Sequence, residues 1–179
     1  WHAVIDRLEA SGVKLEPLVT ELKLVVEQDS IGAFTTVQQP YEGHYLHRRV
    51  QGSTVSAEVI AHAGDVLVRM GQPTDRYVME TLELTAEDGF FAWNFFDSRL
   101  QQKEWFSDYV FEDIAADLLE QDPALKAALE TRRTADPSFA ADAWAQLLFI
   151  YQRSPYFEKS YRQYPVLRVV TLPAELRGR

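Results

Sequence analysis

The first seventy residues show the alternation of hydrophobic and polar positions that is typical of β-strands. In residues 20–28, leucine and valine alternate with charged side chains, and residues 13–18 repeat the pattern. Pro17 within that second run favours a strand at a sheet edge. Residues 1–11 instead have helical spacing and end before Gly12, a suitable helix stop. Further strands are predicted over Tyr45–Val50, Thr54–Ala61 and Asp65–Met70.

Beyond residue 73 the hydrophobic spacing becomes helical. A helix is predicted over residues 74–84 with Thr74 as its N-cap. Asp122 and Asp136 each precede a proline, which is typical of an N-cap followed by proline at the first helical position. We also expect a helix over Ser107–Gln121 that buries Val110, Ile114 and Leu118, and a final helix that buries Phe139, Ala143, Leu147 and Ile150 or Tyr151.

These patterns predict an α+β fold in one domain spanning residues 1–179. Residues 1–72 are expected to be mainly β, residues 73–155 mainly α, and residues 156–172 to return as a strand that pairs with the first-half sheet. The antiparallel β-sheet would have five or six strands in the first half, curled into a sandwich or partial barrel, followed by a C-terminal helical group.

The stretch from Asp88 to Phe106 contains eight large hydrophobic residues, seven of them aromatic. It lies where strands give way to helices, so we expect most of it to be interior packing. Two other interpretations stay open, an aromatic platform for a ligand and an interface with a partner, since aromatic residues dominate interface hot spots. The residues proposed for such an interface are Phe90, Phe91, Trp93, Phe95, Phe96 and Trp105.

Composition narrows the class of protein. The net charge of −9 and the pI near 4.9 argue against a nucleic-acid partner. The chain has no cysteine, which excludes disulfides and thiolate chemistry. No apolar run approaches the length of about 20 residues that spans a bilayer. Because the sequence begins at Trp1 rather than methionine, we expect it to be a portion of a longer protein.

The residue types that carry catalysis form no recognisable motif. His44 and His47 are three apart in a predicted strand, where they would point to opposite faces, and His62 stands near Asp65. Paired acids such as Glu112 and Asp113 suit a solvated helical face better than a general acid and base. We therefore assign no catalytic, cofactor-binding or metal-binding residue in this chain.

Several long phrases run through the chain, among them "WHAVIDRLEASGVKLEPL", "AGDVLVRMGQP", "FFAWNFFDSRLQQKEWFSDYVFEDIAADLL", "DPSFAADAWAQLLFIYQRSPYFE" and "YPVLRV". Together with the "EGH" turn, "METLEL" and "DPALKAALE", they resemble the C-terminal region of bacterial zinc carboxypeptidases of the carboxypeptidase A-like metallopeptidase family. The resemblance covers roughly Trp1 to Val169.

This resemblance implies that the chain is a non-catalytic accessory domain, placed after a catalytic domain that hydrolyses peptide bonds at a C-terminus. The zinc would belong to that catalytic domain, because no histidine here is followed by a glutamate three positions on, as the family's H-x-x-E motif requires. The implied partner is the catalytic domain of the same polypeptide, and a homodimer stays open. The family's exported character implies a periplasmic or secreted location, with a cytoplasmic one not excluded.

Two other functions compete with the accessory domain. The first is a ligand-binding module for peptidoglycan peptides or glycans, which a concave cleft lined by Trp93 or Trp105 and polar side chains would favour. A flat apolar patch with a polar rim would instead favour docking of a domain. The second competitor is an independent hydrolase with paired carboxylates, which needs two acids in different environments facing one cleft.

Overall fold

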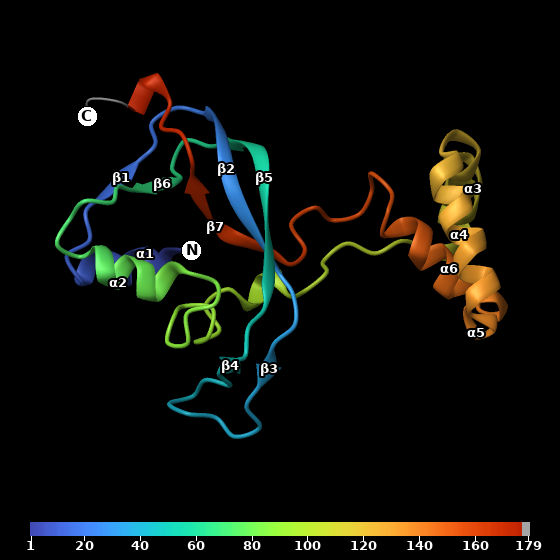
Figure 1. The fold of residues 1–179 in the computed structure, drawn as a ribbon, viewed down its shortest axis with the longest axis horizontal. Coiled ribbons are helices and arrows are strands. Elements are labelled where there is room, and N and C mark those ends of the chain that lie inside the picture. The colour runs from blue at the N-terminus through green and yellow to red at the C-terminus, as the bar shows by residue number, and fades with distance from the viewer. Residues whose placement is uncertain (177–179) are drawn as a thin grey trace. The chain divides into compact units, whose positions relative to one another are not determined.

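The computed structural model describes residues 1–176, which form an α+β fold. The chain divides into two compact units, one made of Trp1–Gln101 with Ser160–Arg179 and the other of Gln102–Lys159. We call them the sheet unit and the helical unit. The C-terminal helices form a unit with a hydrophobic core of their own. Figure 1 draws the elements of both units.

The sheet unit begins with α1 (His2–Ala10), as the helical spacing predicted. Val4 and Leu8 are buried because residues four apart share one face of a helix. The helix ends before Gly12, whose φ of 79° is left-handed and whose N–H donates to the Glu9 carbonyl.

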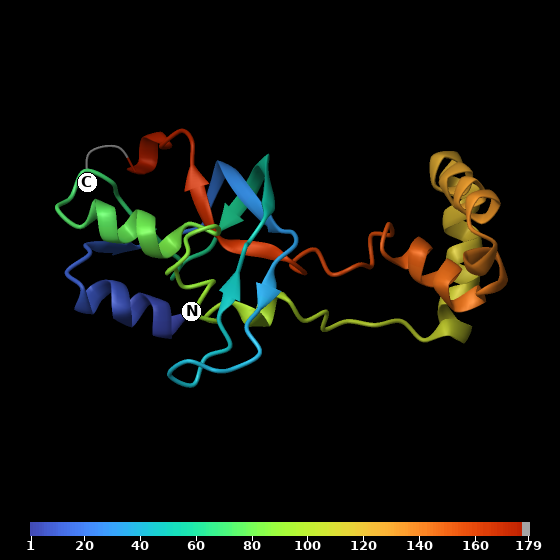
Figure 2. The same ribbon diagram turned by 60° about the horizontal axis from the view of Figure 1, so that its bottom comes forward.

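The central sheet of this unit contains β2 (Leu22–Ile31) between β5 (Gly52–Ala61) and β7 (Gln163–Val169). Both neighbours run antiparallel to β2, with Leu22 opposite Ala61 at one end of the β2–β5 pair and Ile31 opposite Gly52 at the other. The alternation in residues 20–28 is therefore confirmed. The strand predicted to return over residues 156–172 is present and pairs with the sheet, but it occupies only Gln163–Val169. Figure 2 shows β7 lying along β2.

Among the described residues, two smaller antiparallel pairs accompany the central sheet, so the strands form three separate sheets. In the first pair, β1 (Leu15–Pro17) lies beside β6 (Val66–Val68). In the second, β3 (Thr35–Thr36) lies beside β4 (His47–Arg48). The predicted strand Tyr45–Val50 is thus only two residues long, because Arg49 adopts a left-handed φ of 53° that ends the extended backbone.

The segment between the strands and the C-terminal helices is less helical than predicted. α2 (Asp75–Leu82) is present, but the Thr74 side chain makes no capping hydrogen bond, and the Asp75 carboxylate instead accepts from the Gly71 and Gln72 N–H groups. Residues 83–101 then form turns and the short 3₁₀ helix η1 (Asp97–Arg99).

Two hydrophobic cores hold the sheet unit together. The larger contains the inner faces of α1 and α2 with Phe91 and Tyr164, both almost fully buried. The smaller lies against the central sheet around Val26 and includes Leu176 of η2 (Ala174–Leu176). The predicted interior position of the aromatic stretch is confirmed for three of its rings, Phe90, Phe91 and Phe96.

The helical unit contains α3 (Asp108–Gln121), α4 (Pro123–Ala135), α5 (Pro137–Ala141) and α6 (Ala143–Tyr151). The two Asp-Pro caps are confirmed, since each aspartate accepts hydrogen bonds from two backbone N–H groups of the helix that it precedes. The prediction of a single last helix is wrong. It is divided at Asp142, which accepts from the Ala145 N–H and begins a new helix.

The buried faces of these helices also differ from the expected ones. α3 buries Phe111 and Ala115, while Val110 is 49% exposed and Ile114 and Leu118 are only partly buried. Because Phe111 contacts the rings of Phe106 and Tyr151, the aromatic contacts rotate the helix by about one position. Ala143, at the break between α5 and α6, is exposed, whereas Phe139, Ile150 and Tyr151 are buried as predicted.

Candidate functional site

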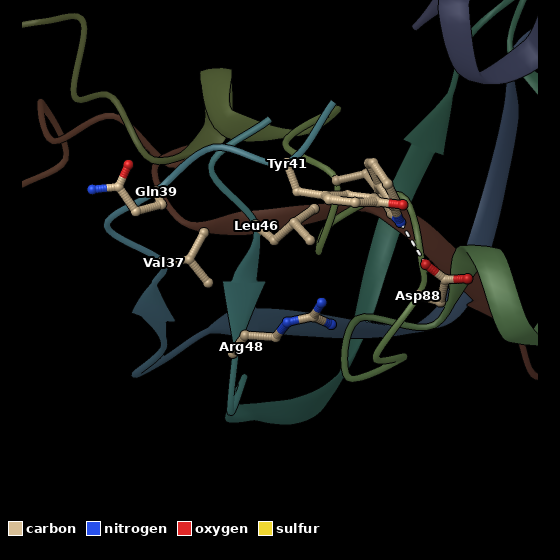
Figure 3. A pocket seen from close by; sticks show the side chains of 7 residues that line it. Val37, Gln39, Tyr41, Leu46, Arg48 and Asp88 are labelled. Atoms are coloured by element: carbon tan, nitrogen blue, oxygen red, sulfur yellow. Dashed lines mark hydrogen bonds between the residues drawn. The ribbon is translucent and has the colours of Figure 1, made fainter. Parts of the chain in front are cut away.

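A hollow of about 550 Å³ opens on the sheet unit beside Trp93. The loop that joins β3 to β4 supplies one side and the segment around Asp88 the other (Figure 3). Its walls combine rings and aliphatic side chains with polar groups, the mixture that ligand sites show. The lining residues are Val37, Gln39, Tyr41, Leu46, Arg48, Asp88 and Trp93.

Trp93 is held in place by its own segment of chain. Its indole Nε1 donates to Asp88 Oδ1 at 2.6 Å, and its backbone N–H donates to the Gly89 carbonyl. Tyr41 and His44 pack against the indole with ring centroids 6.0 and 5.4 Å away. Gly89 permits this fold because a Cβ there would lie 2.9 Å from the Ala86 side chain. The indole is therefore a fixed wall of the hollow.

Two charged groups of opposite sign lie in the same hollow. Arg48 Nη1 donates to the Glu87 carbonyl at 2.8 Å, which orients the guanidinium and leaves further N–H donors for a ligand. Asp88 offers a carboxylate, one oxygen of which already accepts a hydrogen bond from the Trp93 indole. A ligand could therefore pair an anionic group with Arg48 and a hydrogen-bond donor with Asp88, while its flat or apolar part lies against the Trp93 indole.

His47 lies just behind this hollow in a chain of hydrogen bonds. Its Nε2 is 2.9 Å from Asp97 Oδ1, and its Nδ1 is 3.0 Å from Thr36 Oγ1. Because a carboxylate only accepts, Nε2 carries the proton, and in the neutral ring the Thr36 hydroxyl donates to Nδ1. Asn94 is fixed nearby, with Nδ2 donating to the Tyr45 carbonyl.

Hydrolases use the same order of hydroxyl, imidazole and carboxylate in their catalytic triads. Here the packing around His47 gives this series of hydrogen bonds a structural role. The His47 ring lies between Phe34 and Phe91, 4.5 and 5.1 Å between centroids, and its side chain is 5% exposed. The ring is thus enclosed by aromatic neighbours. We infer that His47 connects β3 and β4 to the Asn94–Asp97 segment. This connection holds the walls of the hollow in position.

The three histidines considered for metal binding do not converge. His47 is enclosed as described, His44 packs on Trp93 and Phe95, and His62 is an exposed residue paired with Glu21. In the part of the chain that the structure describes, no three His, Cys, Asp or Glu side chains form a group that could hold a metal ion.

The residues proposed for an interface are distributed between core and surface. Phe90, Phe91 and Phe96 are 6%, 0% and 1% exposed, so a partner could reach them only by displacing the core. Trp93 and Phe95 are partly buried, and the Arg7 guanidinium lies 4.5 Å above the Phe95 ring.

Trp105 belongs to the helical unit, where it is 58% exposed. Its ring stacks on that of Trp144, with centroids 6.4 Å apart.

Sequence reasoning missed most of the hollow. Val37, Gln39, Tyr41 and Arg48 belong to a loop and a two-residue strand without periodicity. A local signal was present in "PYEG", residues 40–43, where Glu42 and Gly43 have left-handed φ values and Tyr41 pairs with His44 as an isolated bridge. A turn that carries an exposed tyrosine is a reasonable marker of a binding loop.

A second polar network supports the central sheet. Arg168 on β7 donates two hydrogen bonds of 2.9 Å to Asp29 on β2 and one of 3.0 Å to Glu83. Burial acts to raise the pKa of Asp29, but the bonds from Arg168 and Thr54 outweigh it and hold this pKa below its usual value. The hydrogen bonds that Arg168 donates to Asp29 and to Glu27 raise the pKa of Arg168.

No helix among the described residues is long and apolar enough to cross a bilayer. Comparison of the chain with protein-family models, with curated proteins and with solved structures gives no match.

Proposed function

We propose that this chain is a non-catalytic accessory domain that belongs to a zinc carboxypeptidase and binds through the hollow beside Trp93. The accessory role rests on the resemblance of the long segments between Trp1 and Val169. In that role the catalytic domain and its zinc lie elsewhere in the same polypeptide.

One observation carries the binding role, the presence of two charged groups that keep further donors and acceptors for a ligand beside a fixed aromatic wall. The enclosed ring of His47 and the paired charges of Asp29 and Arg168 are already used to hold the fold together. Arg48 and Asp88, by contrast, line an open hollow together with Trp93 (Figure 3). Charged groups in such a position are available for recognition.

Two occupants of the hollow compete. In the first, a loop of the catalytic domain docks there, which would stabilise that domain or shape access to its cleft. In the second, the hollow binds peptidoglycan peptides or glycans. The polar lining around Trp93 favours the second occupant, because sugar rings and peptide groups stack on indole and a ligand carboxylate pairs with an arginine.

The accessory role is tested by the coding DNA immediately upstream of Trp1. An open frame that encodes H-x-x-E and a later histidine supports the proposal. A start codon directly before Trp1, with no peptidase in frame, overturns the accessory role and leaves the hollow to be judged on its own.

The binding role is tested by calorimetric titration of the chain with a muropeptide and with the catalytic domain. The Arg48→Ala variant should weaken binding at least tenfold, since a charge-assisted pair contributes about 1.5–3 kcal/mol. Arg76→Ala is the matched control, because Arg76 is an exposed arginine that lies outside the hollow. It forms an ion pair with Glu80 on the surface. Equal binding by both variants would contradict the role assigned to the hollow.

A further inference from the structure

The helical unit carries a pair of tryptophans on its surface. Trp105 precedes α3 and Trp144 lies in the first turn of α6. Their rings are stacked at an interplanar angle of 25° with centroids 6.4 Å apart, yet Trp105 is 58% and Trp144 48% exposed. Two indoles that contact each other and still face solvent form one continuous aromatic surface, which we call the tryptophan pair.

The tryptophan pair is rigid because it is fixed to the core of the helical unit. The Trp144 ring also stacks on Phe106, with centroids 6.4 Å apart and an angle of 22°. Phe106 in turn contacts Phe111 and Tyr151, at 4.9 and 4.8 Å between centroids, and both of these residues are buried. A rigid surface loses little side-chain entropy when it binds, which favours recognition.

The charge around the tryptophan pair is negative. Residues 102–159 contain eleven acidic and six basic residues, a net charge of −5. Glu104 is adjacent to Trp105, and Asp142 stands two positions before Trp144. Each helix start contributes only about half a positive charge, so the full charges of the carboxylates outweigh it. An anionic lipid or nucleic acid would therefore be repelled here.

Arginines in this unit already cover other aromatic rings. Arg132 lies 4.3 Å from the centre of the Phe139 ring, and Arg153 lies 3.6 Å from that of Phe149. Among the residues that the structure describes, no arginine or lysine lies over Trp105 or Trp144. Indole gives the strongest cation–π attraction of any side chain, so the tryptophan pair is a vacant site of the same chemistry.

We propose that the tryptophan pair binds an arginine- or lysine-bearing segment of a polypeptide partner. The cationic side chain stacks on the exposed indole faces while the carboxylates of Glu104 and Asp142 attract its charge. This site lies in the helical unit and does not depend on the hollow beside Trp93.

The test is fluorescence anisotropy of a labelled Gly-Ser-Arg repeat peptide titrated with the full 179-residue chain. A peptide in which citrulline replaces arginine keeps the shape and removes the charge. The arginine peptide should bind and the citrulline peptide should not. Trp105→Ala should weaken binding by about two- to thirtyfold, the range that one cation–π contact provides.

Matched variants separate this contact from general attraction to an acidic protein. Tyr156→Ala removes an aromatic side chain of the same unit with the same 58% exposure, so it should bind like the parent chain. Trp144→Phe keeps a ring on Phe106 and should bind more tightly than Trp144→Ala. Unchanged binding by Trp105→Ala and Trp144→Ala overturns the proposal, as does equal binding of the citrulline peptide or competition by a neutral chitooligosaccharide.

Discussion

Replacing Asp29 by asparagine tests the polar network that ties β7 to the central sheet. Asp29 is 6% exposed and accepts three hydrogen bonds, two from Arg168 at 2.9 Å and one from Thr54 at 2.6 Å. An asparagine amide can keep only one oxygen as acceptor and turns its N–H₂ toward the guanidinium or the hydroxyl. The substitution therefore removes at least one charge-assisted bond.

The loss of unfolding free energy depends on the contacts that Arg168 keeps after Asp29→Asn. Removing one partner of a buried ion pair costs about 3–5 kcal/mol when the other charge is left alone. Arg168 is not left alone, because its side chain is 37% exposed and still pairs with Glu27 and Glu83. We therefore expect a loss of about 2–3 kcal/mol in the free energy of unfolding of the sheet unit. Urea unfolding should shift its midpoint by about 1 M.

The pH dependence of this loss has a definite sign. The folded pKa of Asp29 lies below the reference value of 3.8, so its stabilisation is present above that value and is lost as the pH falls through the folded pKa. The difference between the parent chain and Asp29→Asn should be full at about pH 6 and should shrink below about pH 4. The indole NMR signals of Trp1 and Trp93 follow unfolding of this unit.

A control and a refuting result complete this prediction. Asp6→Asn removes an exposed carboxylate on α1 and should leave both stability and its pH dependence unchanged. If Asp29→Asn has the same unfolding midpoint as the parent chain at about pH 6, or if the difference does not begin to shrink below about pH 4, the carboxylate does not stabilise the sheet in the way described.

Three further substitutions test other parts of the fold. His47→Ala should lower the unfolding free energy by about 3 kcal/mol, because it removes two hydrogen bonds and leaves a void between aromatic rings, and urea unfolding of the sheet unit measures it. Asp142→Ala should cost about 1 kcal/mol in the helical unit through loss of the N-cap to Ala145, seen as an earlier loss of helical circular dichroism. Gly52→Ala should destabilise the β2–β5 pair, because the added Cβ would lie 2.7 Å from the Ser30 carbonyl oxygen, and faster amide hydrogen exchange in β2 would show it. A variant that matches the parent chain in its own assay would contradict the corresponding contact.

Periodic segments were predictable from the sequence because each depends on local physics. The alternation along β2 and the Asp-Pro starts of α4 and α5 specify their elements without reference to distant residues. The sequence predictions failed where tertiary contacts determine the local structure. The turn at Arg49 shortened a predicted strand, and the aromatic contacts of Phe111 rotated α3 relative to its expected face.

The candidate site was predictable only in part. Trp93 was singled out by the density of aromatic residues around it, but density alone did not separate it from the buried Phe91 two positions earlier. Arg48 and Asp88 lie forty residues apart in the sequence and meet in the hollow through the fold of a loop. Such pairings depend on tertiary structure, which no local pattern encodes.

The indole N–H signals of the four tryptophans provide the most direct test of the binding role. A two-dimensional NMR titration of the 179-residue chain with a muropeptide, and separately with the catalytic domain proposed above, follows all four signals at once. Because the Trp93 N–H donates to Asp88 in the hollow, its signal should move with one of these titrants while that of Trp1 stays in place. If the Trp93 signal does not move with either titrant up to about millimolar concentration, where even weak ligands bind, the hollow is not a binding site for them.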